Sequence, residues 1–80
     1  MKITIYSTKT CVYCNMLKNW LDEKKIEYTN YSVEINPIAA QQMVQLSGQM
    51  GVPFTTIEKE DGDMEKILGF DRPRFEALFA

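Results

Sequence analysis

Two short β-rich segments flank one amphipathic helix at the start of the chain, and this arrangement constrains the fold more than any other feature. Residues 2–6 alternate apolar and polar side chains and predict a strand, and residues 26–33 are rich in Ile, Tyr, Thr and Val and predict another. Between them, residues 12–25 place apolar side chains at offsets 0, 3, 4, 7 and 8, which is one face of a helix. These side chains are Tyr13, Met16, Leu17, Trp20 and Leu21. Because a connecting helix lets two strands pair in parallel, we expect a βαβ unit.

The second half of the chain begins with a helix whose two ends are marked. Asn36 is a good N-cap, Pro37 suits the first helical position, and Gly48 is a natural helix stop. The residues between these ends that we expect to face inward are Ile38, Ala39, Met43, Val44 and Leu46.

Two strands and a last helix complete the pattern. Residues 54–58 and 64–68 predict strands, and the glycine-containing turn at residues 60–63 predicts a hairpin between them. Asp71 can cap a final helix whose apolar side is formed by Phe75, Leu78 and Phe79. The predicted order is βαβαββα, an α/β fold with four strands and three helices in a single domain over residues 1–80.

The composition narrows the possible functions. The net charge of −2 and the scattered Lys and Arg side chains argue against nucleic-acid binding. No apolar run reaches the ~18–20 residues of a membrane span, and residues 1–10 lack the pattern of a signal peptide, so we expect a cytoplasmic protein. Two cysteines and no histidine are too few for a disulfide scaffold or for a four-ligand zinc site within one chain. In a reducing cytoplasm, a close cysteine pair is more typical of catalysis than of structure.

Cys11 and Cys14 form a Cys-Val-Tyr-Cys motif where the loop after the first strand meets the predicted helix. Side chains three residues apart on a helix are close enough for a disulfide after a small adjustment of the backbone. The free N–H groups and the positive end of the helix favour a thiolate, so we expect the pKa of Cys11 to lie below the ~8.5 of a free cysteine. We expect Cys14 to be more buried and less acidic. The pattern predicts that Cys11 attacks a target disulfide and that Cys14 then releases the reduced target.

Other interpretations of the motif stay open. The pair could be half of a metal or iron–sulfur site shared between two chains, which would make the chain a binding module, or it could be two incidental small apolar residues. Its position after a strand and at the start of a helix favours redox chemistry. Tyr13 either begins the apolar face of the helix or forms a wall of the thiol site, and we expect Trp20 to belong to the core.

Two later turns each have a structural and a functional interpretation. Pro53 opens the third strand, a position that tolerates proline, and its spacing alone does not establish a cis peptide bond. Asp71 is a good helix cap, and the same helix start offers free N–H groups to a carboxylate. Gly69 would give a ligand close access to that backbone.

Three motifs together resemble the glutaredoxins. They are Cys11-Val12-Tyr13-Cys14 after the first strand, Gly51-Val52-Pro53 before the third strand, and Gly69-Phe70-Asp71 before the last helix. The resemblance covers nearly the whole chain. Residues 47–53 and 69–73 are most similar to short bacterial glutaredoxin-like proteins and to the redoxins that reduce ribonucleotide reductase.

The resemblance implies a thioredoxin fold with the strand order 2-1-3-4 and the third strand antiparallel to the first. It implies that Pro53 is cis and that the Val52 backbone pairs with the cysteine segment of a substrate. We expect Cys11 and Cys14 to be the catalytic residues, with no bound cofactor or metal, and we favour glutathione as the electron donor because Tyr13 and Asp71 remain. The residues expected to contact substrate or glutathione are Lys9, Tyr13, Val52, Pro53, Gly69, Phe70 and Asp71.

Four residues depart from the glutaredoxin pattern. Val12 replaces the usual proline between the cysteines, and Lys9 lies one position closer to the first cysteine than the usual lysine. Gly51 replaces a threonine, and Leu68 replaces the first glycine of a Gly-Gly pair. Each change weakens the expected glutathione site, so a thioredoxin-reductase-type flavoenzyme stays open as the donor and ribonucleotide reductase as a target. We expect a monomer that reduces disulfides in electron transport and cell redox homeostasis.

Overall fold

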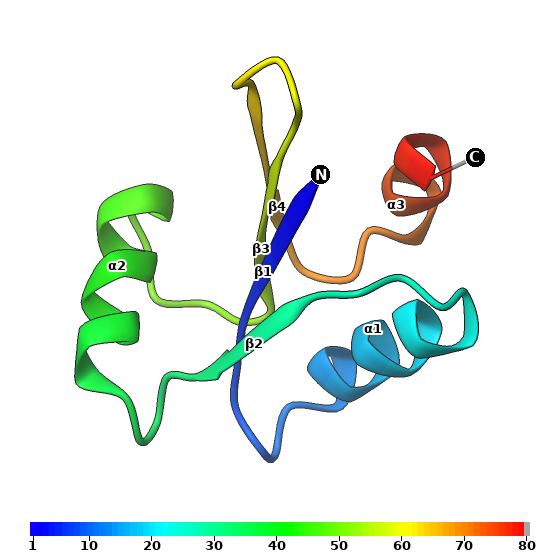
Figure 1. Cartoon of the computed structure of the whole chain (residues 1–80). Helices are drawn as coiled ribbons and strands as arrows, with labels where there is room; N and C mark the ends of the chain where they lie inside the picture. Colours follow the sequence, from blue (N-terminus) through cyan, green and yellow to red (C-terminus); the bar gives the residue numbers. More distant parts are fainter. Residues whose placement is uncertain (80) are drawn as a thin grey trace.

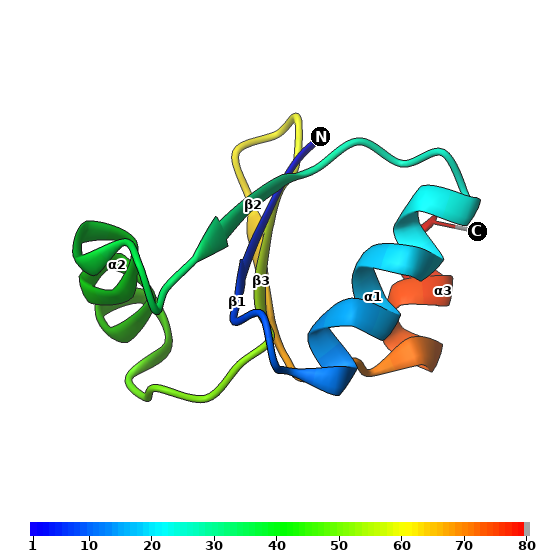
Figure 2. The ribbon, with the colours of Figure 1, turned by 90° about the horizontal axis from the view of Figure 1, so that it is seen from below.

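A four-stranded sheet separates two layers of helices in the computed structural model, which describes residues 1–79 (Figure 1). The strands are β1 (Lys2–Ser7), β2 (Thr29–Ser32), β3 (Phe54–Glu58) and β4 (Met64–Leu68). The helices are α1 (Val12–Glu23), α2 (Pro37–Ser47) and α3 (Arg72–Phe79). Seen along the edge of the sheet, α1 and α3 lie on one face and α2 lies alone on the other (Figure 2).

The strand order is β2-β1-β3-β4, as predicted. β1 runs parallel to β2 and antiparallel to β3, and β3 and β4 form an antiparallel hairpin. Tyr6 of β1 and Leu68 of β4 both pair with Phe54 at the start of β3. The end of β1, the start of β3 and the end of β4 therefore meet at one edge of the sheet, and all three predicted motifs adjoin this edge.

β2 is shorter than the predicted strand over residues 26–33. The N–H of Ile26 bonds the carbonyl of Leu21 at 2.9 Å, and Lys25 adopts a φ of 58°, so the chain first closes the end of α1. Ile26 and Tyr28 then pack against the core from a loop instead of from the sheet. Their apolar side chains produced the β-rich pattern although their backbones do not join a ladder.

The larger core fills the space between the sheet and the α1–α3 layer. Its buried members are Ile3, Ile5, Leu17, Trp20, Leu21, Ile57, Ile67 and Phe75. Alternate residues of β1 and β3 point to this face, as the period of a strand requires. Trp20 lies in the core as predicted, and its ring packs against Phe75 at 6.2 Å between centroids.

The inward face of α1 differs from the predicted one. Leu17 and Leu21 are buried as expected, but Tyr13 and Met16 are exposed and Cys14 is fully buried instead. The two candidate faces of the helix overlap in Leu17 and Leu21, so spacing alone does not decide between them. In the structure, the buried face is the one that contains Cys14, and Tyr13 lies on the solvent side.

α2 has the predicted ends and a smaller buried face than predicted. The Asn36 side chain accepts a hydrogen bond from the N–H of Ala39 at 3.1 Å, and Gly48 adopts the left-handed conformation that ends the helix. Ala39 and Met43 are buried against Tyr6 and Phe54 of the sheet. The expectation that Ile38 and Val44 face inward is wrong, since both are exposed; Leu46 is half-buried.

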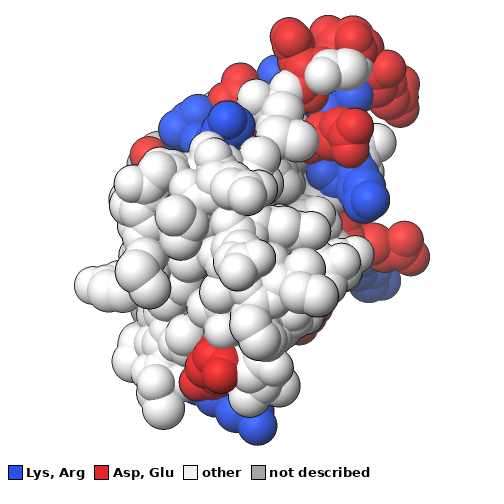
Figure 3. Space-filling view, turned by 90° about the vertical axis from the view of Figure 1, so that its left-hand side faces the viewer, with Lys and Arg blue, Asp and Glu red and all other residues white. Residues whose placement is uncertain are grey.

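The face of the molecule that α2 covers is almost free of charge (Figure 3). No Asp, Glu, Lys or Arg occurs from residue 35 to residue 57. Charged side chains gather at the edges of this face, above all at the end where the β3–β4 hairpin carries a dense acidic group. Among the helices of residues 1–79, only α2 contains no charged residue.

α3 packs on α1 through aromatic side chains and is tied to β4 by an ion pair. Phe75 is fully buried, and a guanidinium nitrogen of Arg74 lies 2.7 Å from a carboxylate oxygen of Glu65. The hydrogen bond from Arg74 is the main cause that lowers the pKa of Glu65 below 4.5, and the nearby charge of Lys59 adds to it. This pair fixes the start of α3 against the sheet.

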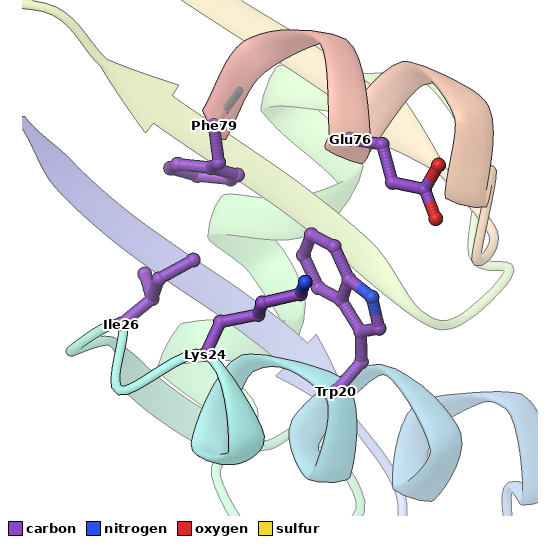
Figure 4. Close-up of a pocket in the computed structure, with 5 residues that line it drawn as sticks. All are labelled: Trp20, Lys24, Ile26, Glu76 and Phe79. Carbon is purple, nitrogen blue, oxygen red and sulfur yellow. The ribbon is translucent and has the colours of Figure 1, made fainter.

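A hollow of about 510 Å³ lies between the far ends of α1 and α3 (Figure 4). It is lined by Trp20, Lys24, Ile26, Glu76 and Phe79. The Lys24 ammonium lies 5.8 Å from the centre of the Trp20 ring. Because Cys11 is at the opposite end of a helix that is about 18 Å long, the hollow is separate from the disulfide. No helix within residues 1–79 is long and apolar enough to span a membrane.

Candidate active site

Cys11 and Cys14 form a disulfide at the start of α1, with their Cα atoms 5.2 Å apart. Cys11 is the N-cap residue of this helix, and its Sγ accepts a hydrogen bond from the N–H of Cys14 at 3.1 Å. Cys11 is partly exposed and Cys14 is 0 % exposed. The predicted difference in burial between the two cysteines is therefore confirmed. Solvent therefore reaches part of Cys11 and none of Cys14.

The loop before Cys11 is held by a residue that the sequence did not indicate. The Glu34 carboxylate accepts a hydrogen bond from the backbone N–H of Lys9 at 2.7 Å. Glu34 reaches the loop because β1 and β2 are parallel and end side by side, with Ser7 paired with Ser32. The two residues are 25 positions apart, so no local pattern could have predicted the contact. Lys9 itself is exposed.

The segment that leads into β3 forms the second side of the site. The Val52–Pro53 peptide bond is cis, as the resemblance implied, and Pro53 is buried. Val52 is half-buried and packs against the smaller core under α2. Within residues 1–79, the N–H and the carbonyl of Val52 take part in none of the hydrogen bonds of the structure. They are available to pair with another chain.

The turn before α3 is joined directly to this segment. The N–H of Gly69 bonds the carbonyl of Pro53 at 2.7 Å, so the second and third predicted motifs are in contact. Gly69 has a φ of 81°, and a Cβ at this position would meet no atom within 4 Å. The positive φ, and not a lack of space, is the reason for glycine here.

Asp71 and Phe70 have different roles in this turn. Asp71 is exposed and its carboxylate accepts a hydrogen bond from the N–H of Arg74 at 3.4 Å, which is the predicted cap of the last helix. Phe70 is half-buried, with its ring centre 6.0 Å from that of Phe75 and 6.2 Å from that of Trp20. The side chain of Phe70 therefore belongs to the core, whereas that of Asp71 is free on its outer side.

Large apolar side chains are exposed around the disulfide. On the helix side, Tyr13 is 63 % exposed and lies beside Val12 and Met16, which are also exposed. Away from the helix, Leu68 is 56 % exposed beside Gly51, and Met50 is 78 % exposed in a hollow that it shares with residues of α2. Exposed apolar side chains of this kind are typical of a surface that contacts another molecule. Of the two interpretations of Tyr13, the exposure favours the wall of the thiol site.

Gln49 fixes the backbone between α2 and the cis proline, and sequence analysis missed it. Its side-chain oxygen accepts a hydrogen bond from the N–H of Gly51, and its side-chain nitrogen lies 3.2 Å from the carbonyl oxygen of Gly51. The same nitrogen lies 3.1 Å from the hydroxyl of Ser47. The sequence signal was limited to a polar residue in a turn, which does not predict a specific contact.

Among residues 1–79, no group of three or more His, Cys, Asp or Glu side chains is arranged to hold a metal ion. The chemistry that the site can perform on its own is the opening and closing of the Cys11–Cys14 disulfide.

A model of the glutaredoxin family matches residues 3–61 of the chain. A glutaredoxin-like 8.6 kDa protein of the rubredoxin operon of Clostridium pasteurianum is 36 % identical over 76 residues, which is 95 % of each chain. The chain belongs to the glutaredoxin family. This glutaredoxin is also similar to the glutaredoxin-like protein NrdH of Lactococcus lactis, at 28 % identity over 54 residues that cover 68 % of this chain and 74 % of the relative.

Solved structures share the fold of this glutaredoxin, which is the thioredoxin fold. The thioredoxin-like protein BC3987 has a TM-score of 0.83 at 23 % identity, with 96 % of this chain and 99 % of that chain covered. The NrdH-redoxin of Escherichia coli has a TM-score of 0.78 at 24 % identity, with 98 % and 95 % covered. The family and the disulfide together make the chain a glutaredoxin-like thiol–disulfide oxidoreductase.

Proposed function

We propose that this glutaredoxin reduces disulfides of proteins and peptides with Cys11 as the attacking thiol and Cys14 as the resolving thiol. The observation that carries the proposal is the pairing of a partly exposed N-cap cysteine with a fully buried cysteine one helical turn away. An attacking thiol must be reachable, and a resolving thiol must be protected but close enough to form a bond. The N–H of Cys14, which donates to Cys11 Sγ in the disulfide, would donate equally to a Cys11 thiolate.

Two exchange steps account for all atoms and electrons. The Cys11 thiolate attacks one sulfur of the target disulfide, that S–S bond breaks, and the other target sulfur leaves as a thiolate. Cys14 then loses its proton, attacks the Cys11 sulfur and releases the second target sulfur. The target gains two electrons, and the protein is left with the Cys11–Cys14 disulfide.

Glutathione is the first candidate for the donor that restores the dithiol. Two exposed side chains support it: Tyr13 beside the disulfide and Asp71 at the start of α3. The ammonium of glutathione would contact the Asp71 carboxylate, and a glutathione carboxylate would contact free N–H groups at the start of α3. We place the reaction in the cytoplasm, because a reducing compartment keeps such a pair in use as a dithiol. We expect the protein to act as a monomer.

A thioredoxin-reductase-type flavoenzyme is the second candidate donor, and ribonucleotide reductase is the candidate target that accompanies it. Two relatives support it through their descriptions: the Lactococcus lactis protein is called NrdH, and the Escherichia coli NrdH-redoxin is described as having a thioredoxin-like activity profile. The four departures from the glutaredoxin pattern favour the same alternative; they are Val12, Lys9, Gly51 and Leu68.

Single cysteine variants test the division of roles. After incubation with a peptide disulfide, Cys14→Ser should accumulate a mixed disulfide at Cys11, because the resolving thiol is absent, and Cys11→Ser should accumulate almost none. Intact mass spectrometry measures the trapped fraction. Equal trapping by the two variants would contradict the assignment, and a wild-type protein that reduces no disulfide would reject the proposed function.

A further inference from the structure

The backbone that precedes the cis proline is held by one side chain, and we call this contact the Gln49 clamp. The carboxamide of Gln49 offers an acceptor to the N–H of Gly51 and a donor to the carbonyl of Gly51. A neighbouring strand satisfies a residue in the same way, with one acceptor and one donor. Both polar backbone groups of Gly51 are therefore occupied, and those of Val52, the next residue, are not.

The Gln49 clamp is anchored on α2. The Ser47 hydroxyl lies 3.1 Å from the side-chain nitrogen of Gln49 and 2.6 Å from the carbonyl oxygen of Met43, in the last turn of the helix. Met43 is buried under the sheet. Gln49 and Ser47 therefore link the peptide groups of Gly51 to the core, although the loop itself lies on the surface.

Gly51 and Gln49 fit each other sterically. A Cβ on residue 51 would lie 2.6 Å from the side-chain oxygen of Gln49, which is closer than such atoms approach in proteins. Gly51 does not share the positive φ of Gly48, Gly62 and Gly69. Gly51 thus leaves space for the Gln49 amide, and a larger residue at this position would displace it.

We propose that Gln49 is a positioning residue that makes this glutaredoxin selective for disulfides in extended peptide segments. By holding Gly51, it orients the free N–H and carbonyl of Val52 so that they pair with the backbone on either side of a substrate cysteine. Gln49 touches neither sulfur, so it acts on recognition and leaves the chemistry of Cys11 unchanged. This inference rests on the proposed function.

Two probes separate recognition from chemistry. The first is the disulfide-linked dimer of acetyl-Ala-Cys-Ala-amide, whose amides can pair with Val52, and the second is bis(2-hydroxyethyl) disulfide, which has no amide. Gln49→Ala should lower kcat/KM for the peptide about tenfold, the effect expected when hydrogen bonds that order the pairing backbone are lost. The rate with bis(2-hydroxyethyl) disulfide and the pH dependence of Cys11 alkylation should not change.

Gln45→Ala is the matched control, because Gln45 is an exposed glutamine on α2 whose side chain forms no hydrogen bond with residues 1–79. It should leave both rates unchanged. Gly51→Ala should reproduce the Gln49→Ala effect, since the added methyl group displaces the Gln49 amide. The double variant should be no worse than either single one, because the same contact is lost in all three.

The proposal is overturned if Gln49→Ala keeps the wild-type rate with the peptide, or if both probes slow down equally. It is also overturned if the effects of Gln49→Ala and Gly51→Ala multiply in the double variant, since that would mean two independent contacts. If the wild-type protein reduces neither probe, the proposed function has failed instead, and the two failures are thereby distinguished.

Discussion

Cys11 occupies a helix position where Ser, Thr, Asp or Asn is usual. Its sulfur takes the place of the capping oxygen and accepts a hydrogen bond from the N–H of Cys14. This contact serves the fold in the disulfide form, and it remains available to a thiolate after reduction. A single residue thus caps α1 and presents the reactive atom, and the capping contact lies at the point where negative charge develops.

Asp71 is the residue that tests the glutathione donor. Asp71→Asn keeps a side chain that can cap α3 but removes a carboxylate that would hold the ammonium of glutathione. One charge-assisted contact is worth roughly 1.5–3 kcal/mol, so kcat/KM for glutathione should fall about tenfold or more. The melting temperature should change little.

Asp63→Asn in the β3–β4 hairpin is the control for the lost charge, and it should leave the glutathione kinetics unchanged. Steady-state assays with glutathione and glutathione reductase measure both variants. If Asp71→Asn retains wild-type kinetics, Asp71 is only a helix cap, and the flavoenzyme becomes the better candidate donor.

The site forms where the ends of three strands and the starts of two helices lie close together. The end of β1, the start of β3 and the end of β4 lie at one edge of the sheet, and α1 and α3 both begin there. The bond from Gly69 to Pro53 joins two of these ends at 2.7 Å. The ion pair between Glu65 and Arg74 holds α3 to β4 near the opposite end of that strand.

Glu65→Gln tests that link through pH. The folded protein lowers the pKa of Glu65 below 4.5, so the ion pair stabilises the fold above the unfolded pKa and loses its effect as the pH falls through the lowered folded value. Urea unfolding from pH 7 to pH 3 should show a smaller acid-induced loss of stability in Glu65→Gln than in the wild type.

Glu60→Gln is a suitable control, because Glu60 forms no salt bridge with any of residues 1–79. The two variants should therefore lose different amounts of stability between pH 7 and pH 3. If Glu65→Gln and Glu60→Gln lose the same amount, the Arg74 contact contributes nothing to the stability of the folded state.

Local chemistry made several of these elements predictable. Asn36 and Gly48 mark the ends of α2 because capping and the left-handed conformation depend on the residue itself, and β3 and β4 have the predicted bounds. The phase of α1 was not predictable at Tyr13 and Met16, since two overlapping faces satisfied the same spacing.

The contacts that shape the site were also outside the reach of pattern analysis. Glu34 reaches Lys9 only after two distant strands have paired, and Gln49 reaches Gly51 through a side chain that has no preferred partner in a turn. Both are side-chain to backbone bonds, which leave no period in a sequence.

The two faces of the sheet are covered by unequal amounts of helix. α1 buries four residues and shares its layer with α3, whereas α2 buries two and has no neighbouring helix on its face. An element with little buried apolar area opens at lower free energy than the rest of a fold. α2 also carries the Ser47 anchor, so its motion is linked to the segment beside the disulfide.

Native-state hydrogen exchange should reveal this difference. The amides of α2 should exchange through a partial opening that needs less free energy than the exchange of the amides near Leu17 in α1. Phe75→Ala, which removes a fully buried ring, should lower the protection of α1 by about 3–5 kcal/mol. If α1 and α2 exchange with one common free energy at low denaturant, the protein opens as a single unit and the expected layering is absent.

The absence of charge from residue 35 to residue 57 has a consequence for how other molecules arrive. Charged patches attract a partner before contact, and dissolved ions screen that attraction at distances beyond about 8 Å at physiological ionic strength. The side of the molecule seen in Figure 3 is a long, almost uncharged surface with charged side chains at its edges. A partner that binds this side arrives by diffusion without electrostatic steering, and shape complementarity selects it after contact. Its association rate constant should therefore be nearly the same at low and at physiological ionic strength.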